Sequence, residues 1–445
     1  MTRVGLNLGM AFSIWGVLGC TWTRFDDVTD NPPVERFDVS NDVSGAGQSV
    51  ASFATAAGSD LAVSAVNKLL LYELGAGVDP SRTAVKTQAC NGDASCLLTR
   101  QLVGLQPSAL LENNGCVAYG IGTYDFGTGA AAGSVQLLCE DLKQRWLPVP
   151  DTFTTWLTGN AISSDMVVSM ATTRRGDVQP LVVSVPNAQA TWFYDGVDPT
   201  PIELPALPDD NLAGRTLAVI GEGDGYWVAS GSVTTDNSVW LYRVNSDRTA
   251  TLAGCIEGAS QFGRILATGN FDDDGIDDLA VADDQRVVLI RGSNLTSVAE
   301  NTGGPCTSLD AVQVIGSASC TQLPDLDGCA ASPYVGAIAT GNLDALGPDE
   351  LGPDELIVGA PNTSVRGEEA AGAVFLYAWS NDALHIVQGL YVSSAASDDL
   401  LGTSVAITHA ADIDTVVAGV PGDDTVMAFY CNSLMPAQSR SARCH

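Results

Sequence analysis

Residues 270–278 read Asn-Phe-Asp-Asp-Asp-Gly-Ile-Asp-Asp and form a short acidic segment with oxygen-bearing side chains at alternate positions. Asn270, Asp272, Asp274 and Asp278 occupy positions 1, 3, 5 and 9, and a glycine stands at position 6. Calcium takes about six to eight hard oxygen ligands, and alternate side chains of a tight turn converge on one point. The carbonyl of Ile276 at position 7 adds an oxygen, and the glycine permits the reversal. The segment therefore predicts a calcium site.

The flanking residues indicate which kind of calcium loop this is. An EF-hand needs Glu at position 12 and a helix on each side, whereas position 12 here is Val281. The flanks at 265–267 and 279–281 are short apolar runs typical of strands. We expect a calcium loop within a β-hairpin. The alternative is an acidic Asx-type turn without metal.

The strands around this loop belong to a pattern that recurs along the chain. A short strand of small and apolar residues, a polar turn, a Val-rich strand and a third strand ending in an aromatic residue follow one another in seven copies. The third residue of each small strand anchors the copy. The anchors are Ala51, Leu110, Ala171, Ala218, Ala267, Ala339 and Ala406, separated by 59, 61, 47, 49, 72 and 67 residues.

Repeats of this length suit one four-stranded sheet each, and such sheets close into a propeller that buries both faces of every sheet. We predict an all-β fold, a seven-bladed β-propeller with four-stranded blades, over residues 34–445. The tail after Tyr430 lacks a convincing fourth strand, whereas residues 34–39 alternate like one. We expect this N-terminal strand to complete the last blade. The alternative is that it caps the first.

The N-terminus reads as an export signal. Arg3 supplies a short positive region, and residues 4–18 are an apolar stretch too brief to span a bilayer comfortably. Val-Leu-Gly-Cys at 17–20 resembles the bacterial lipobox, in which the cysteine is lipidated. This predicts a signal peptide at 1–19, lipidation at Cys20, a tether at 20–33 and membrane attachment through the lipid. The alternative is an ordinary signal peptide followed by a buried cysteine.

The ten cysteines beyond Cys20 form an even set in an exported chain, which favours disulfides. Sequence alone leaves their connectivity open. None shows zinc spacing with a histidine. Pairing of nearest neighbours would join Cys90 with Cys96, Cys116 with Cys139, Cys255 with Cys306, Cys320 with Cys329, and Cys431 with Cys444.

The chain is strongly acidic. It carries 52 acidic and 20 basic side chains, a formal charge of −32, and 45% of its residues are hydrophobic. Such a composition is typical of a folded chain, and the charge repels phosphate backbones. We therefore expect no nucleic-acid partner.

Several short motifs of the fifth and sixth copies occur together: Phe262-Gly263, the acidic loop itself, Asp278-Leu279 and Gly359-Ala360-Pro361. Together they resemble the FG-GAP repeats of integrin α-chain propellers. The resemblance covers residues 45–430 and is strongest in these two copies. It implies a seven-bladed propeller, calcium in strand-connecting loops on one face, and a ligand or partner on a loop-bearing face.

The sixth copy departs from this pattern. Asn342 and Asp344 match positions 1 and 3 of the loop, but Leu346 occupies position 5. Leu-Gly-Pro-Asp-Glu occurs twice in tandem, at 346–350 and 351–355, so either Glu350 or Glu355 supplies the last ligand. Whether this weaker loop binds a second calcium stays open.

The sequence contains no G-x-S-x-G, H-E-x-x-H or P-loop motif. We expect a monomeric cell-envelope lipoprotein, on the periplasmic or the cell-surface side, that acts as a binding, adhesion or scaffold module. A protein or glycan ligand would bind on a propeller face. The alternative is a propeller hydrolase or lyase that acts on an extracellular polysaccharide or another polymer.

Overall fold

In the computed structural model of the chain, nearly all of the described regular elements are β-strands. The predicted signal peptide, Cys20 and the tether lie outside the residues that it describes. The described residues are 34–38, 46–55, 58–65, 68–73, 86–89, 98–105, 111, 115–121, 134–139, 144–150, 169–173, 179–207, 213–223, 225–232, 237–259, 261–299, 306–309, 312, 314–319, 335–343, 353–380, 383–392, 394–410 and 413–431.

The described strands form seven small sheets, each named here after its strand nearest the centre of the ring. The β2 sheet contains β2 (Val50–Thr55), β3 (Gly58–Ala65), β4 (Lys68–Glu73) and β5 (Lys86–Ala89). The β6 sheet contains β6 (Leu98–Leu105), β7 (Cys116–Ile121), β8 (Ser134–Cys139) and β9 (Gln144–Trp146). The β10 sheet contains β10 (Ser169–Thr172), β11 (Leu181–Val185), β12 (Ala190–Tyr194) and β13 (Ile202–Glu203), with the 3-10 turn η3 (Pro186–Ala188).

The remaining sheets follow the same plan. The β14 sheet contains β14 (Ala213–Glu222), β15 (Gly225–Ser232), β16 (Ser238–Val244), β17 (Ala250–Glu257) and β21 (Thr307–Ser308), which is parallel to β17. The β18 sheet contains β18 (Ile265–Gly269), β19 (Asp278–Ala282), β20 (Arg286–Ile290) and β22 (Val314–Ser319), with η4 (Gly292–Asn294) and the helix α2 (Leu295–Ala299). The β23 sheet contains β23 (Ala337–Gly341), β24 (Glu355–Ala360), β25 (Ala373–Ser380) and β26 (Ala383–Leu390). The β27 sheet contains β27 (Val405–Ala410), β28 (Ile413–Val420), β29 (Thr425–Cys431) and β1 (Val34–Asp38).

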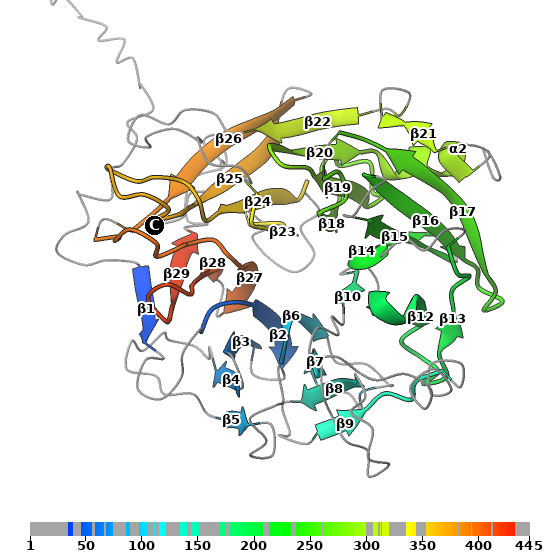
Figure 1. The fold of residues 1–445 in the computed structure, drawn as a ribbon, viewed down its shortest axis with the longest axis horizontal. Coiled ribbons are helices and arrows are strands. Elements are labelled where there is room, and N and C mark those ends of the chain that lie inside the picture. Colours follow the sequence, from blue (N-terminus) through cyan, green and yellow to red (C-terminus); the bar gives the residue numbers. More distant parts are fainter. Residues whose placement is uncertain are drawn as a thin grey trace, which may run out of the picture.

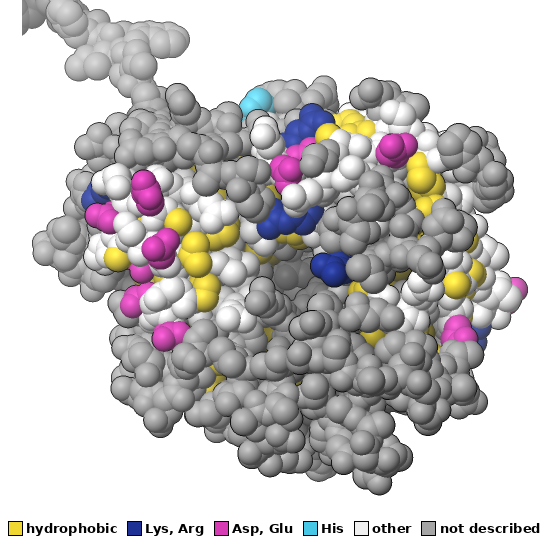
Figure 2. All heavy atoms as spheres, in the orientation of Figure 1, with side chains coloured by type: hydrophobic (Ala, Val, Ile, Leu, Met, Phe, Trp, Pro, Cys, Tyr) yellow, Lys and Arg dark blue, Asp and Glu magenta, His cyan; other side chains and the backbone are white. Residues whose placement is uncertain are grey.

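The sheets stand around a common centre, as in a propeller (Figure 1). Their inner strands contact one another in the cyclic order β2, β6, β10, β14, β18, β23, β27 and back to β2. They line a central cavity of about 330 Å³, and one face of the ring is hollowed near its centre (Figure 2). The predicted anchors of six copies lie on the cavity wall: Ala51, Ala171, Ala218, Ala267, Ala339 and Ala406.

The middle strands are buried on both faces because each sheet packs between two others. Every residue of β19 is buried. Leu279 and Val281 pack into a cluster with the β14 sheet, whereas Ala280 and Ala282 pack into a cluster with the β23 sheet. This two-sided packing explains why the central strands read as continuous apolar runs rather than as alternating ones.

The N-terminal strand joins the end of the chain, as predicted. β1 pairs antiparallel with β29, in a register that places Val34 opposite Phe429 and Asp38 opposite Thr425. The next described segment reinforces this closure, because Ser404 Oγ, directly before β27, donates a buried hydrogen bond of 2.7 Å to the Gly47 carbonyl.

Neighbouring sheets approach most closely through glycines. Gly263 precedes β18 with a φ of 88°, and its carbonyl accepts a 2.6 Å hydrogen bond from Thr216 Oγ1 of β14. A Cβ on Gly231 of β15 would lie 2.0 Å from that carbonyl oxygen, so only glycine fits there. The same contact recurs between the glycines 402 and 359 and, at the closure of the ring, between the glycines 47 and 419.

The predicted first strand of the second copy is wrong. The inner strand is β6, whereas residues 108–110, with the predicted anchor Leu110, lie outside the described part of the chain. Val103 of β6 lines the cavity in place of that anchor. The sequence misled because a register break between Leu98 and Leu102, spanning a polar Thr-Arg-Gln segment, hides the apolar run of β6.

Two of the nearest-neighbour cysteine pairs form disulfides. Cys116 bonds to Cys139, its cross-strand partner between β7 and β8, and Cys255 of β17 bonds to Cys306. These bonds indicate an oxidising compartment, extracellular or periplasmic. The side chains of the other three pairs lie outside the described residues. Among the described residues, no helix has the length and apolar character needed to cross a membrane.

Candidate metal site

The predicted calcium loop lies in the hairpin between β18 and β19. Gly269 pairs with Asp278 at the base of this hairpin, and residues 270–277 form the connection. Asp273 and Gly275 take left-handed conformations with φ of 59° and 83°, which turn the chain back on itself. The local sequence suits this path because Asp and Gly tolerate positive φ better than bulky residues do.

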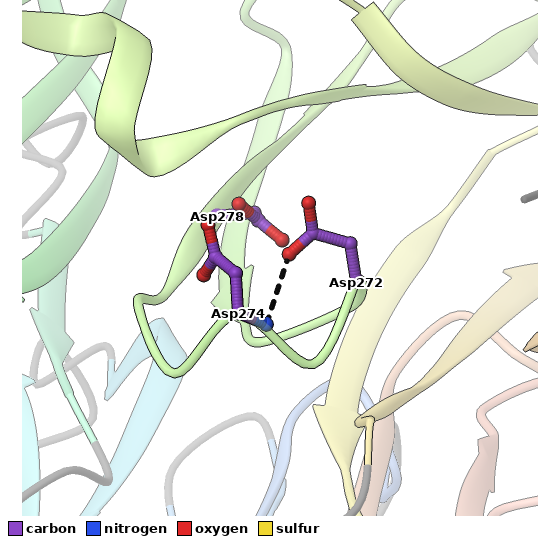
Figure 3. Close-up of side chains that lie close together, drawn as sticks. All are labelled: Asp272, Asp274 and Asp278. Carbon is purple, nitrogen blue, oxygen red and sulfur yellow. Dashed lines mark hydrogen bonds between the residues drawn. The ribbon is translucent and has the colours of Figure 1, made fainter.

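Three carboxylates converge inside the hairpin. Asp272, Asp274 and Asp278 each place one carboxylate oxygen within 4.8 Å of the others, and Figure 3 shows the side chains turned toward one another. Oxygens that share one calcium ion at about 2.3–2.6 Å lie at most about 5 Å apart. The donor set and its spacing therefore fit a hard divalent cation.

The other two residues with predicted ligand atoms, Asn270 and Ile276, also take part in hydrogen bonds that shape the loop. The Asn270 Oδ1 accepts a hydrogen bond of 3.3 Å from the Gly275 amide, and the Ile276 amide donates one of 2.8 Å to Asp274 Oδ1. The Asp274 amide donates one of 3.3 Å to Asp272 Oδ1. These bonds fix the turn, so each ligand oxygen already has a defined place.

Asp278 is fully buried and is held by the backbone on both sides. Its Oδ2 accepts a 3.0 Å hydrogen bond from the Phe271 amide, and its Oδ1 accepts one of 2.9 Å from the Gly292 amide. Burial raises the pKa of Asp278 to about 7, and the negative charge of Asp272 acts in the same direction. A bound cation would favour the ionised carboxylate.

Sequence reasoning missed one cation at this site. Arg291, directly after β20, places Nη2 2.6 Å from Asp272 Oδ2. The pair is ionic but not aligned as a hydrogen bond, since both Asp272 Oδ2 and Arg291 Nε are buried atoms without a hydrogen-bond partner. Its sequence signal is weak, because Arg291 comes 13 residues after the last residue of the loop.

Sequence reasoning also missed a carboxylate that supports the loop from the next sheet. Asp354 Oδ2 accepts a 2.7 Å hydrogen bond from the Asn270 amide, and the Asp354 amide donates one of 2.8 Å to the Asn270 carbonyl. Asp354 belongs to the second Leu-Gly-Pro-Asp-Glu copy, in which the sequence predicts only the glutamate as a ligand. A second contact to the loop comes from Thr173, directly after β10, whose Oγ1 donates a 3.0 Å hydrogen bond to Asp277 Oδ2.

The second predicted loop is described only in part. Glu355 pairs with Gly341 at the base of the β23–β24 hairpin, as Asp278 does with Gly269. Its Oε2 accepts a 2.7 Å hydrogen bond from the Leu343 amide, which makes it the counterpart of Asp278. Asn342 follows β23 in the described chain. The other two candidate ligands of this loop, Asp344 and Glu350, lie outside the described residues.

Comparisons with known proteins give little beyond this geometry. No protein-family model matches the chain, and no curated protein matches it. Among solved structures, the chain is similar to one titled "Crystal Structure of Mitotic Checkpoint Complex", with 10% sequence identity and a TM-score of 0.48. That likeness covers 97% of this chain and 98% of that chain.

Proposed function

We propose that this protein is an exported binding, adhesion or scaffold module built on a seven-bladed FG-GAP-type propeller. Calcium stabilises the hairpin of residues 270–278, and lipid on Cys20 anchors the module to the cell envelope. The observation that carries the proposal is the convergence of three carboxylates within 4.8 Å in a hairpin at the end of an inner strand.

The arrangement of the sheets supports a seven-bladed propeller. The described strands form seven sheets, and the inner strands contact one another in a closed cycle. The glycine contacts support the FG-GAP assignment. In the motifs Phe262-Gly263 and Gly359-Ala360-Pro361, each glycine lies close to a glycine of the neighbouring sheet, Gly263 to Gly231 and Gly359 to Gly402. The physical need for a close approach of two backbones thus accounts for the glycines of both motifs.

The charge of the hairpin supports calcium. Asp272, Asp274 and Asp278 carry three negative charges when ionised, more than the single positive charge of Arg291 can offset. A divalent cation would offset this excess, and calcium prefers such carboxylate oxygens. Calcium would hold the hairpin in place, because Asp278 is already fixed to two backbone amides.

The position of the site supports a structural role for the metal and a binding role for the module. The loop connects two strands of one sheet, and Asp354 links it to the next sheet. A cation here would stiffen the loop-bearing face, on which a protein or glycan ligand would bind. Rigid loops on a fixed scaffold are a common arrangement for recognition.

A binding experiment with a calcium control tests this function. The purified protein is applied to a glycan array and to a set of envelope proteins, with calcium and with a chelator. We expect saturable binding that weakens in chelator, without turnover of the bound polymer. Cleavage of a polysaccharide by the purified protein would contradict the binding role and favour the hydrolase or lyase alternative.

A further inference from the structure

Two arginines hold equivalent places in neighbouring sheets. In the β14 sheet, Trp227 pairs with Arg243. In the β18 sheet, Leu279 pairs with Ile290, so the next residues outward are Asp278 and Arg291. Each arginine therefore stands on the third strand or directly after it, beside the hairpin that joins the first two strands. Each also reaches a carboxylate of that hairpin, Glu222 or Asp272.

Arg243 is firmly held in its pair. Its Nη1 donates a hydrogen bond of 2.7 Å to Glu222 Oε2, and its guanidinium lies 5.0 Å from the centre of the Trp227 ring. Trp227 Nε1 donates a second hydrogen bond of 2.6 Å to the same Glu222 oxygen. The Glu222 carboxylate is thus neutralised by Arg243 and hydrogen-bonded twice, so this carboxylate is satisfied without a metal.

Arg291 is held less completely. It approaches Asp272 Oδ2 at 2.6 Å, but its Nε has no hydrogen-bond partner. Its side chain is 33% exposed, whereas that of Asp272 is 5% exposed. Arg243 is about as exposed, at 26%, so the two pairs differ in bonding. The Arg291 guanidinium makes no aligned hydrogen bond to Asp272, whereas Arg243 donates one to Glu222 and lies over Trp227, so Arg291 can leave its carboxylate at a lower cost.

We infer that Arg291 is an internal counter-cation that holds the metal-free hairpin and competes with calcium for Asp272. A cation bound to Asp272 and a guanidinium on the same carboxylate repel each other, so calcium binding requires Arg291 to withdraw or to share the group. Arg291 therefore lowers calcium affinity and keeps the hairpin folded when calcium is scarce. This inference rests on the proposed calcium site.

The test compares the wild type with Arg291→Gln, which keeps much of the side chain and removes the charge. Calcium binding is measured by titration calorimetry, and melting is measured with calcium and with chelator. We expect calcium affinity to rise about tenfold, as expected for removing one nearby positive charge. We also expect a lower melting temperature in chelator, because Asp272 then lacks a counter-charge.

Two further variants separate charge from structure. Arg291→Lys keeps the charge and should bind calcium with an affinity within about twofold of the wild type, because Coulomb repulsion depends on the charge. Arg243→Gln is the matched control in the β14 sheet. It should lower the melting temperature equally with and without calcium and leave calcium affinity unchanged. If Arg291→Gln does not fold, the test rests on the calcium affinity of Arg291→Lys. An affinity at least tenfold weaker or tenfold tighter than that of the wild type overturns the inference, and an affinity within about twofold supports it.

The outcomes distinguish this inference from the proposed function. Equal or weaker calcium binding by Arg291→Gln, with binding by the wild type intact, overturns only the role of Arg291. Binding by Arg291→Gln alone supports it strongly. If neither protein binds calcium at millimolar concentration, the proposed calcium site fails and the inference fails with it.

Discussion

The hairpins of the β14 and β18 sheets use one backbone plan with different chemistry. In both, an arginine-paired carboxylate precedes a residue in the left-handed conformation, Gly223 at φ 56° and Asp273 at φ 59°. The two hairpins differ at the residue of the second strand that lies opposite the arginine. This position holds Trp227 in the β14 sheet and Asp278 in the β18 sheet. A buried aromatic side chain occupies this position in the first hairpin, whereas a buried carboxylate, whose charge a bound cation would offset, occupies it in the second.

This difference is the one expected if only the second hairpin holds the proposed calcium ion. Trp227 stacks on Arg243 and donates to Glu222, so the two charged groups that the structure describes there, Arg243 and Glu222, both have partners in the protein. In the other hairpin, Arg291 pairs with Asp272, and the carboxylates of Asp274 and Asp278 lie close to that pair. Like charges at this spacing cost free energy that a bound divalent ion would offset.

The largest effect is expected from Asp278→Ala. The change leaves the buried amides of Phe271 and Gly292 without acceptors and removes a proposed calcium ligand. We expect a loss of roughly 3 kcal/mol in the free energy of unfolding without calcium, and no further stabilisation when calcium is added. Urea denaturation in chelator and in calcium measures both. Trp227→Ala is the control, since it should destabilise the protein yet keep the calcium response.

A normal calcium response in Asp278→Ala would show that the ion does not use this carboxylate. The equivalence between the positions of Asp278 and Trp227 would then account for how the two hairpins pack and would say nothing about metal binding.

The next effect concerns Asp274, which is exposed and lies in the connection between β18 and β19. Calcium at about 100 times its dissociation constant stabilises a folded protein by about 2.7 kcal/mol, and chelator removes that contribution. We expect chelator to lower the melting temperature of the wild type and Asp274→Ala to abolish most of that shift. In chelator the variant should melt close to the wild type.

Asp247→Ala provides the matched control for Asp274→Ala. Asp247 is also exposed and accepts a hydrogen bond from the amide two residues later, but it lies in the turn between β16 and β17. Its removal should leave the chelator shift intact. A melting curve of the wild type that does not respond to chelator would contradict the calcium site.

The fold was largely readable from the sequence because each copy repeats the same physical requirements. Small residues such as Ala218 and Ala267 suit the crowded centre of the ring, and central strands such as β19 must be apolar on both faces. The N-terminal strand was also predictable, since the last copy lacked a fourth strand. Where a strand is interrupted, as in β6, the pattern failed.

The site was readable only as far as neighbours in sequence determine it. Alternate oxygens in residues 270–278 predicted the cluster of Asp272, Asp274 and Asp278. The supporting groups come from elsewhere, Arg291 from the third strand and Asp354 from the next sheet. Their roles depend on strand register and on packing between sheets, and neither leaves a spacing that a single sequence reveals.

A smaller effect is expected from Asp354→Ala, which tests whether the next sheet supports the calcium hairpin. The change removes the acceptor of the Asn270 amide, and we expect a loss of about 1.5 kcal/mol in the free energy of unfolding and a weaker calcium affinity. Asp354→Asn is the control, because its amide oxygen still accepts that hydrogen bond. Equal calcium affinity in wild type and Asp354→Ala would mean that the two hairpins act independently.

The smallest effect concerns the left-handed residue that the two hairpins share. Asp273 is exposed and stands between two ligand positions, so its side chain is not needed for calcium. We expect Asp273→Gly to change the free energy of unfolding by no more than about 0.5 kcal/mol, because relief of the left-handed strain and the greater freedom of the unfolded chain largely cancel.

Gly223→Asp reverses the exchange in the β14 sheet, where a Cβ on Gly223 would meet no atom within 4 Å. This variant should cost a similarly small amount of stability, and calcium affinity should be unchanged in both variants. Denaturation curves and calorimetric titration measure these quantities. A large loss of calcium affinity in Asp273→Gly would place a ligand at Asp273. The correspondence between Asp272-Asp273 and Glu222-Gly223 would then fail, because only one of the two left-handed residues would be structural.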